Sequence, residues 1–288
     1  MPADRSNLKT IVRGAYDVQK LRIQMGNRIV GNFKAKLGQA PGQPEEEMDA
    51  EGKQILESIR AAYKKITDGV KVFPRQKDFV GDEVISDYTE LCLVAQYIDL
   101  EKHEDQHFRR LGNILEEFPI YVHFLKGVRG VGPAMAGVII SEIDITKAKY
   151  PSSLWAYAGL DVASNGAGRS RKKEHLVERA YTDREGNPAT RVGITFNPFL
   201  KTKLLGVLAS SFLRCKDSPY ADVYRNYKHR LEGHEKYKDV SKGHRHNMSM
   251  RYAVKRFLVD LYAKWREIEG LPVSKEYHEA KQGHVHAA

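Results

Sequence analysis

Apolar residues recur at spacings of three and four along the first part of the chain, which is the pattern of amphipathic helices. This periodicity predicts helices over residues 7–37, 45–69 and 84–118, of which the third is the longest. Glycine and proline between residues 38 and 44 separate the first helix from the second. A short basic loop joins the second helix to the third, so these two are predicted to form a long antiparallel coiled-coil hairpin. Its apolar stripe either faces the protein's own core or forms a dimer seam.

The pattern changes after residue 118. A compact segment, FLKGVRGVGPAMAGVIISEI, is followed by helices predicted over residues 153–159, 198–213, 220–231 and 246–268. Residues 161–198 are rich in Gly, Arg and Lys and poor in apolar residues, which predicts a basic loop with a short β-hairpin at 184–187. We therefore predict a mainly α fold, with a helical and coiled-coil region over 1–118, a helical domain over 119–270 and a flexible tail over 271–288.

The positive charge of the chain is confined to its second half. Residues 1–150 contain 22 Lys and Arg and 22 Asp and Glu, whereas residues 151–288 contain 25 and 15, and the difference of ten equals the net charge of +10. A solvated surface usually mixes both signs of charge. A surplus in half of a chain indicates a polyanionic partner, because each Lys or Arg set against a phosphate releases condensed counterions. We interpret the surplus as a nucleic-acid interface; the alternative is a solvating surface.

The composition argues against membrane and secreted proteins. No apolar run approaches the ~20 residues of a membrane span, and the N-terminus MPADRSNLKT has no apolar signal-peptide core. The two cysteines, Cys92 and Cys215, are far apart and lack CxxC spacing. A disulfide framework is therefore not expected, and a cytoplasmic location fits. We predict no metal and no cofactor, because the histidines lack Cys or carboxylate partners at ligand spacing.

The segment GVRGVGPAMA fits the turn of a helix-hairpin-helix unit. Its glycines permit a tight turn, Pro133 suits the first turn of the next helix, and the alanines allow close packing. Free N–H groups at that helix start would bind phosphate without reading sequence. Arg129, Gly130 and Gly132 are therefore candidate nucleic-acid-binding residues. The alternative is a helix–helix turn without a ligand.

A basic loop, RSRKK at residues 169–173, follows this segment. From Ser164 to Arg256 the sequence has 21 Lys and Arg and 9 Asp and Glu. Gly166 and Gly168 allow the loop to follow a nucleic-acid backbone, and arginine forks suit phosphates. The alternative is a solvated run of charge. The candidate phosphate-binding residues in and after this loop are Arg169, Arg171, Lys172, Lys173, Arg179, Arg191, Lys201 and Lys203.

A third basic group begins the last predicted helix. Arg251 and Lys255 share a face of this helix at i,i+4, and His244 and Arg245 precede them as further candidates. Tyrosines are interleaved with the basic residues, and they either stack on unpaired bases or pack half-buried. They are Tyr220, Tyr224, Tyr227, Tyr237 and Tyr252.

Four segments carry a resemblance to a known family: GVRGVGPAMAGVIISEI, KYPSSLWAYAGL, NPFLKTKLLGVLASSFLR and HNMSMRYAVKRFLVDLY. From about Phe118 to Gly270 the chain resembles the C-terminal domain of the bridge-RNA-guided insertion-sequence transposases. In that family a RuvC-like nuclease domain and a coiled coil precede this domain, and a serine after the AYAGL-type segment is a second catalytic element. Here a helix is predicted where the nuclease strand would lie, and the candidates for the serine are Ser164 and Ser170. Glu142 and Asp144, a tight acidic pair, are expected to be surface acids.

A coiled coil followed by this domain is similar to the Nop-domain organisation of box C/D guide-RNA particles. It is more similar still to the Tas proteins of tandem-interspaced-guide-RNA systems, some of which carry no nuclease. The resemblance implies a homodimer that holds a guide RNA, which pairs with a DNA target. Two alternatives stay open. One is a transposase or recombinase with a serine nucleophile, and the other is a guide-free helix-hairpin-helix DNA-binding protein.

Overall fold

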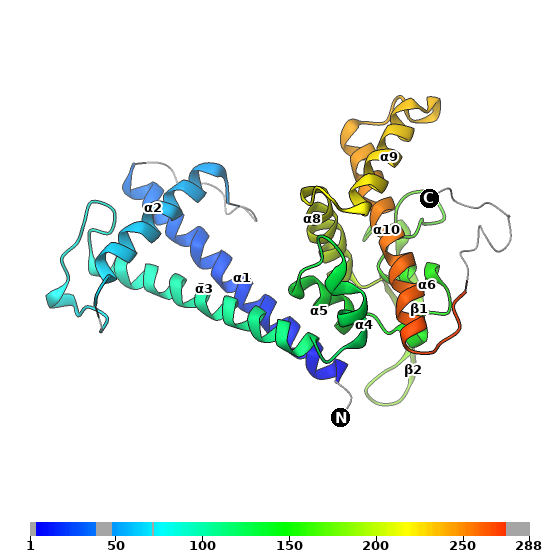
Figure 1. Cartoon of the computed structure of the whole chain (residues 1–288), viewed down its shortest axis with the longest axis horizontal. Coiled ribbons are helices and arrows are strands. Elements are labelled where there is room, and N and C mark those ends of the chain that lie inside the picture. The colour runs from blue at the N-terminus through cyan, green and yellow to red at the C-terminus, as the bar shows by residue number, and fades with distance from the viewer. Residues whose placement is uncertain (1–3, 39–47, 71, 275–288) are drawn as a thin grey trace. The chain divides into compact units, whose positions relative to one another are not determined.

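The computed structural model describes residues 4–38, 48–70 and 72–274, and these form a mainly helical fold, as predicted (Figure 1). They fall into two compact units. One contains residues 10–110, and the other contains the residues from 111 onward together with the first residues up to Lys9. No helix among the described residues is long and apolar enough to cross a membrane. The predicted helix start at residue 45 and the tail beyond residue 274 lie outside the described residues. The domain boundaries at 118 and 270 stay predictions.

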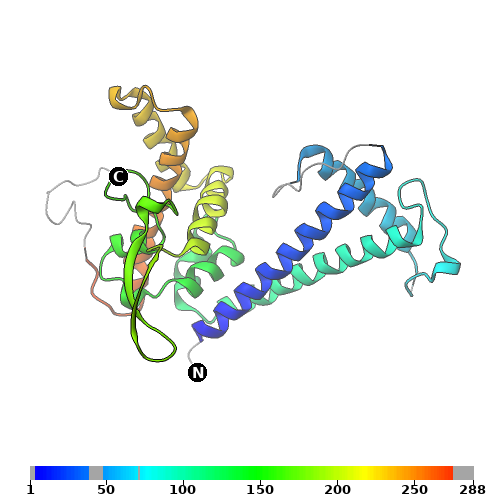
Figure 2. The same cartoon turned by 180° about the vertical axis from the view of Figure 1, so that it is seen from behind.

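The unit of residues 10–110 is built on two long antiparallel helices, α1 (Arg5–Lys36) and α3 (Tyr88–Leu115). Near one end of the pair, Lys36 Nζ lies 3.0 Å from Glu90 Oε2, and toward the other, Gln19 Nε2 donates to Glu104 Oε1 at 2.8 Å. Figures 1 and 2 show the two helices side by side. The hydrophobic pattern predicted a hairpin of α3 and the helix before it. The structure adds α1 as a neighbour of α3, which the sequence did not indicate. A coiled coil stays a prediction.

Helix α2 (Ala50–Thr67) completes this unit. Arg60 Nη2 donates to Tyr97 Oη at 2.5 Å and to Glu101 Oε1 at 2.6 Å, so α2 also contacts α3. The three helices and the loop before α3 share one buried cluster, made of Ile29, Val30, Phe33, Leu56, Ile59, Ala62, Ile85, Leu91, Val94 and Tyr97.

Helix α3 is shorter at both ends than the predicted 84–118. At its start, Asp87 Oδ1 accepts hydrogen bonds from the backbone N–H groups two and three residues on, at 2.7 and 2.9 Å, which caps the helix at Tyr88. At its end, Pro119 disfavours helical backbone at Phe118, whose φ and ψ are −100° and 115°. Side-chain caps and proline sterics therefore override the hydrophobic period at these boundaries.

The second unit contains the remaining helices. They are α4 (Pro119–His123), α5 (Pro133–Glu142), α6 (Pro151–Tyr157), α7 (Pro198–Thr202), α8 (Ala209–Arg214), α9 (Pro219–Gly233) and α10 (Lys242–Ile268). Proline occupies the first turn of α4, α5, α6, α7 and α9, where its missing N–H is not needed. A π-helical turn, Lys203–Leu208, joins α7 to α8. Helix α10 begins before the predicted residue 246, because Ser241 Oγ accepts from His244 N at 3.2 Å.

Helix α10 lies at the centre of this unit. The Phe257 ring lies 5.6 Å from Phe212 and 5.4 Å from Tyr220, so α8, α9 and α10 share one aromatic cluster. Farther along, the buried Arg266 guanidinium donates to the carbonyl oxygens of Ile145 at 3.2 Å and Ala148 at 2.8 Å. These bonds attach α10 to the segment that follows α5.

Helix α5 is buried along nearly its whole length, and Glu142 at its end is only 4% exposed. The expectation that Glu142 is a surface acid is therefore wrong. Its carboxylate accepts from Asn197 Nδ2 at 2.6 Å and lies 3.3 Å from Lys9 Nζ. A buried carboxylate needs such partners, and they come from distant parts of the sequence. Asp144 is more exposed and lies 3.4 Å from Arg5 Nη1.

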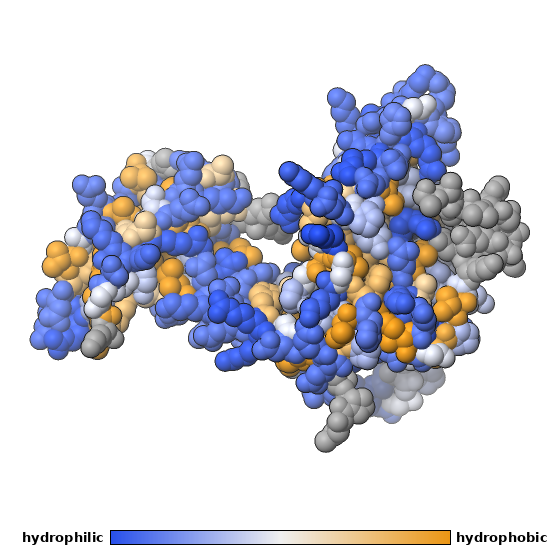
Figure 3. Space-filling view, viewed as in Figure 1, coloured by the Kyte–Doolittle hydropathy of each residue, from blue (hydrophilic) through white to orange (hydrophobic). Residues whose placement is uncertain are grey.

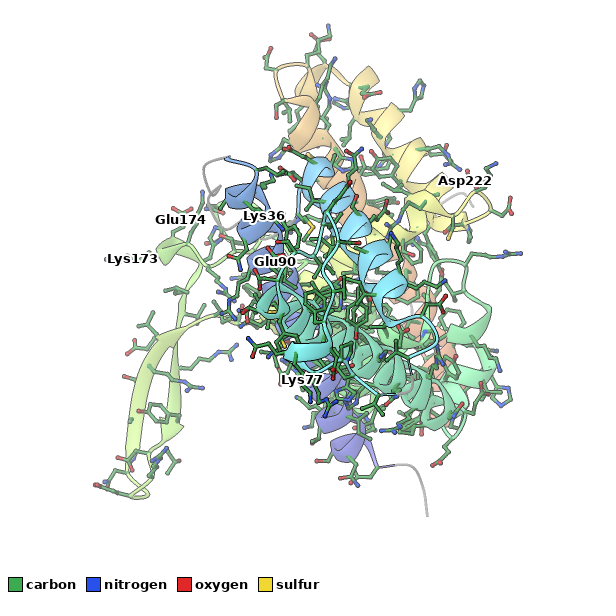
Figure 4. All side chains as sticks on the ribbon, turned by 90° about the vertical axis from the view of Figure 1, so that its left-hand side faces the viewer. Lys36, Lys77, Glu90, Lys173, Glu174 and Asp222 are labelled. Atoms are coloured by element: carbon green, nitrogen blue, oxygen red, sulfur yellow. The ribbon has the colours of Figure 1, made fainter. Side chains whose placement is uncertain are left out.

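The predicted β-hairpin is present, with strands β1 (Val177–Thr182) and β2 (Pro188–Gly193) in antiparallel register. Figure 4 shows it extending from a base where Lys173 and Glu174 lie. The segment between α6 and the hairpin folds back on itself. Val162 and Gly168 form a β-bridge, and Ala163 N donates to Ala167 O at 2.8 Å.

Two glycines in the segment after α6 give a test of the packing. Both Gly159 and Gly166 have left-handed backbones, with φ of 65° and 77°. An added Cβ at Gly159 would lie 2.7 Å from the Phe196 ring, whereas at Gly166 it would meet nothing within 4 Å. Gly166→Ala should therefore lose about 1–2 kcal/mol from backbone strain alone. Gly159→Ala should lose a further ~1–3 kcal/mol from overpacking. Urea unfolding measures both, and equal losses would contradict the packing described here.

Candidate nucleic-acid interface

Four cations from three segments converge beside the loop after α6: Arg169, Lys201 on α7, and Arg251 and Lys255 on α10. We call them the cation cluster. Lys201 Nζ donates to the backbone carbonyl of Arg169. The Arg251 guanidinium lies so close to Gly168 that a Cβ there would be 2.7 Å from Nη1. A glycine at this position therefore allows the loop to lie directly on the arginine.

Aromatic rings line the cluster. Lys255 Nζ lies 5.1 Å from the centre of the Trp155 ring, and Trp155 Nε1 donates to the Lys255 carbonyl at 3.3 Å. Lys201 Nζ lies 4.5 Å from the centre of the Phe196 ring. Such contacts stabilise a cation by about 0.5–2 kcal/mol, and they leave its hydrogen-bonding capacity available to a ligand.

Burial and mutual repulsion destabilise the charged forms of these cations. The pKa of Lys201 is lowered to about 8, first by burial and then by the neighbouring Arg251 charge. The pKa of Lys255 is lowered by the same two causes in the same order, and burial lowers the pKa of Arg251. Asp161 is the carboxylate that opposes all three shifts.

Asp161 does not neutralise the cluster. Its Oδ2 accepts from Arg169 Nε at 3.0 Å and Nη2 at 2.7 Å. Its Oδ1 is buried without a hydrogen-bond partner within the described residues. Over the same part of the chain, no ion pair is found for Lys201, Arg251 or Lys255. A partly desolvated group with surplus positive charge is a site where a bound anion gains much interaction energy.

The predicted basic loop divides into two parts. Arg169 is half-buried and paired with Asp161. Arg171, Lys172 and Lys173 are exposed, and Lys172 Nζ lies 4.0 Å from Glu174 Oε1. The exposed part therefore suits long-range attraction of an anion, while Arg169 belongs to the cation cluster.

The two candidate serines lie in different surroundings. Ser164 is exposed. Ser170 Oγ lies 2.8 Å from Nδ1 of the buried His175, which also accepts from Ser170 N at 3.0 Å. His175 Nε2 in turn lies 3.7 Å from Glu174 Oε1. A serine and a histidine in contact are two elements of an activated nucleophile. The Glu174 carboxylate lies beyond hydrogen-bond distance of the imidazole, whose Nε2 lies 3.0 Å from Asn165 Nδ2. The sequence reasoning missed His175, and a histidine five residues after the serine was the signal for it.

The turn before α5 has a packing role. An added Cβ at Gly130 would lie 2.9 Å from the Phe212 ring, so this glycine allows the turn to approach α8. Gly132 is exposed and precedes Pro133 as the cap residue of α5, and Arg129 is exposed beside it. The helix-hairpin-helix interpretation of this turn stays a prediction.

Residues 122–184 match the model of the Transposase IS116/IS110/IS902 family. No curated protein matches the chain. The transposase-family segment runs from α4 to the turn of the β-hairpin, so it includes Asp161, Arg169 and Ser170. This supports a relation to insertion-sequence transposases. Lys201, Arg251 and Lys255 lie beyond the segment.

The basic residues near the start of α10 also lie beyond the transposase-family segment, and they serve the fold in part. Arg245 Nη1 donates to the carbonyl oxygens of Tyr237 at 3.0 Å and Val240 at 2.6 Å, so it holds the loop between α9 and α10. His244 is exposed. On the face seen in Figure 3, hydrophilic residues cover most of the α9–α10 hairpin, which carries the label α9 in Figure 1.

The interleaved tyrosines pack against protein. Tyr220 and Tyr224 are buried. Tyr227 and Tyr252 stack on each other with ring centres 4.2 Å apart, and the Arg230 guanidinium lies 4.7 Å from the Tyr227 ring. Packing, one of the two interpretations of these residues, is therefore what the structure contains.

Lys203 lies in the π-helical turn, where burial lowers its pKa.

No group of three or more His, Cys, Asp or Glu side chains within residues 4–38, 48–70 and 72–274 could hold a metal ion.

The electrostatics of the cation cluster can be measured directly. Arg251→Gln removes a positive charge that lowers the pKa of Lys201, so this pKa should rise from about 8 toward its ordinary value of 10.5. An NMR titration of the Lys201 side chain measures it. Arg230→Gln, which removes an arginine that is not among the causes of the shift, should leave the pKa of Lys201 unchanged. Equal pKa values in wild type and Arg251→Gln would contradict the described cluster.

Proposed function

We propose that this chain binds a guide RNA and directs it to a DNA target, without cleaving nucleic acid itself. The cation cluster carries the proposal. Its charges are partly buried and only partly balanced by Asp161, and a phosphate would supply the missing partner. The relation of residues 122–184 to insertion-sequence transposases supports a nucleic-acid ligand. The guide RNA comes from the resemblance to Nop-domain and Tas-type proteins.

In this proposal the ligand is held by its backbone. Lys201, Arg251 and Lys255 bind phosphate at the cluster, and the exposed Arg171, Lys172 and Lys173 extend the contact along the strand. Phosphate contacts position a nucleic acid without reading its bases. Target choice is then left to base pairing between guide and DNA.

The double variant Lys201→Met/Lys255→Met tests the cluster. It removes two half-buried charges while it keeps side chains of similar length. Affinity for RNA should fall by about tenfold or more, and the slope of log affinity against log salt should flatten by about 0.7 per lost contact. The free energy of unfolding should stay equal or rise, because two desolvated charges are removed.

A matched control is Lys53→Met/Lys65→Met on α2, where both lysines are exposed. It changes the net charge by the same amount and should bind RNA as wild type does. A folded cluster variant with wild-type RNA affinity and slope would refute the cluster as the phosphate site. A lower stability with unchanged affinity would show that the lysines only support the fold.

We further propose that the chain forms a homodimer through the unit of residues 10–110. Exposed apolar side chains, among them Val72 and Val80 at 77% and 83% exposure, lie between α2 and α3 and support an interface there. Light scattering on protein freed of nucleic acid should give twice the chain mass of 32.8 kDa. A monomer both with and without RNA would contradict the dimer.

A second function, strand transfer or cleavage by a serine nucleophile, is favoured by one observation, the 2.8 Å contact between Ser170 Oγ and His175 Nδ1. Under the first proposal, protein loaded with RNA leaves its target DNA intact with magnesium or manganese. DNA cleavage or a covalent protein–DNA product, present in wild type and lost in Ser170→Ala and His175→Ala, would establish the second function instead. Ser164→Ala is the matched control, since Ser164 is exposed and no hydrogen bond is found for its hydroxyl within the described residues.

A further inference from the structure

The β1–β2 hairpin is exposed on both of its faces. Every residue of β1 is exposed, and β2 has only two half-buried positions. Figure 4 shows the two strands projecting away from their base at Lys173 and Glu174. Because neither face of the hairpin is buried, its surface is open to a ligand. A two-stranded hairpin without a packed face is only marginally stable in water, and a bound ligand would stabilise it.

The register sorts the strand charges by face. Arg179 lies directly opposite Arg191, and Tyr181 lies opposite Ala189. Directly opposed residues share a face, and the Arg191 guanidinium lies 5.4 Å from the Tyr181 ring, on that same face. We call it the arginine face. The opposite face contains Glu178, Ala180, Thr182, Pro188, Thr190 and Val192.

Two opposed arginines repel each other. Side chains at directly opposed positions have Cβ atoms about 4.5–5.5 Å apart, and like charges there destabilise a sheet. No ion pair is found for either arginine within the described parts of the chain. The Asp183 carboxylate in the turn is held by backbone groups, since it accepts from Glu185 N at 2.9 Å and Asn187 N at 2.8 Å. An acceptor-rich ligand placed on the arginine face would remove the repulsion.

We propose that the hairpin lies in the major groove of duplex DNA with its arginine face toward the base pairs. A two-stranded ribbon fits the major groove of B-form DNA, which is about 12 Å wide. Six-residue strands span about 20 Å, which corresponds to about half a turn of that duplex. The major groove of A-form RNA is too narrow for side chains to read. The occupant is therefore DNA, and Glu178 faces away from it.

The ligand atoms on this face are acceptors, either guanine edges on the groove floor or phosphate oxygens at its rim. Both suit an arginine fork. This site goes beyond the proposed function, since the hairpin would bind duplex DNA without guide RNA. The test uses duplex DNA alone, so a failure of guide-RNA binding leaves its result unaffected.

The experiment measures affinity for a guanine-containing DNA duplex, for the same duplex with 7-deazaguanine, and for an RNA duplex, across a salt series. Arg179→Gln/Arg191→Gln in the full chain should bind the DNA about tenfold more weakly than wild type. If guanine edges are bound, 7-deazaguanine weakens wild type but not the variant. If phosphates are bound, the variant's salt slope flattens by about 1.8 for two contacts.

The control is Thr182→Ala/Thr190→Ala on the opposite face, which should bind the DNA as wild type does. Circular dichroism and a melting curve verify that each variant is folded, and the glutamines relieve rather than add strain at the opposed positions. Wild-type affinity for DNA in a folded arginine variant would overturn the proposal. A loss confined to the RNA duplex would overturn it as well, because the occupant would then be RNA.

Discussion

Burial of one face of α10 decides where the cations of the second unit lie. Ala253, Val254, Phe257, Leu258 and Leu261 are all buried. Loss of one large aromatic side chain from such a core costs about 3–5 kcal/mol, so the helix cannot rotate without a large loss of stability. Arg251 and Lys255, one turn apart on α10, are thereby held beside Gly168 and Trp155. The free energy gained by burying the core offsets the cost of partly desolvating these charges.

The cluster works against the stability of the free protein. The pKa of Lys201 in the folded chain is about 8, below its ordinary value of 10.5. Between these values the unfolded chain binds more protons, so the destabilising contribution of Lys201 is fully present below pH 8 and declines as the pH rises toward 10.5. At neutral pH the charged lysine therefore destabilises the fold, and a bound anion would reverse this effect. Charged groups that destabilise the fold are expected at functional sites.

Much of the fold could be predicted from sequence, because helices with a buried face keep the 3.6-residue period. The long helices, the β-hairpin and the position of the basic surplus were all predicted. What could not be predicted depends on contacts between distant residues. Glu142 is buried because Asn197 and Lys9 reach it, and no local pattern indicates this. The convergence of Lys201 with Arg251 likewise requires the packing of α7 and α10, which periodicity does not give.

The transposase-family segment and the cations beyond it contribute different parts of the proposed interface. The segment supplies Asp161, Arg169 and Gly168, and its paired carboxylate and guanidinium are close to neutral by themselves. Helices α7 and α10 add the positive charge that this loop lacks. Asp161 opposes the repulsion among these cations, and its Oδ1 has no hydrogen-bond partner within the described residues. A second carboxylate would satisfy the cluster and leave no gain for a phosphate. The imbalance between this loop and the helices packed against it therefore supports the proposal that the surface binds a polyanion.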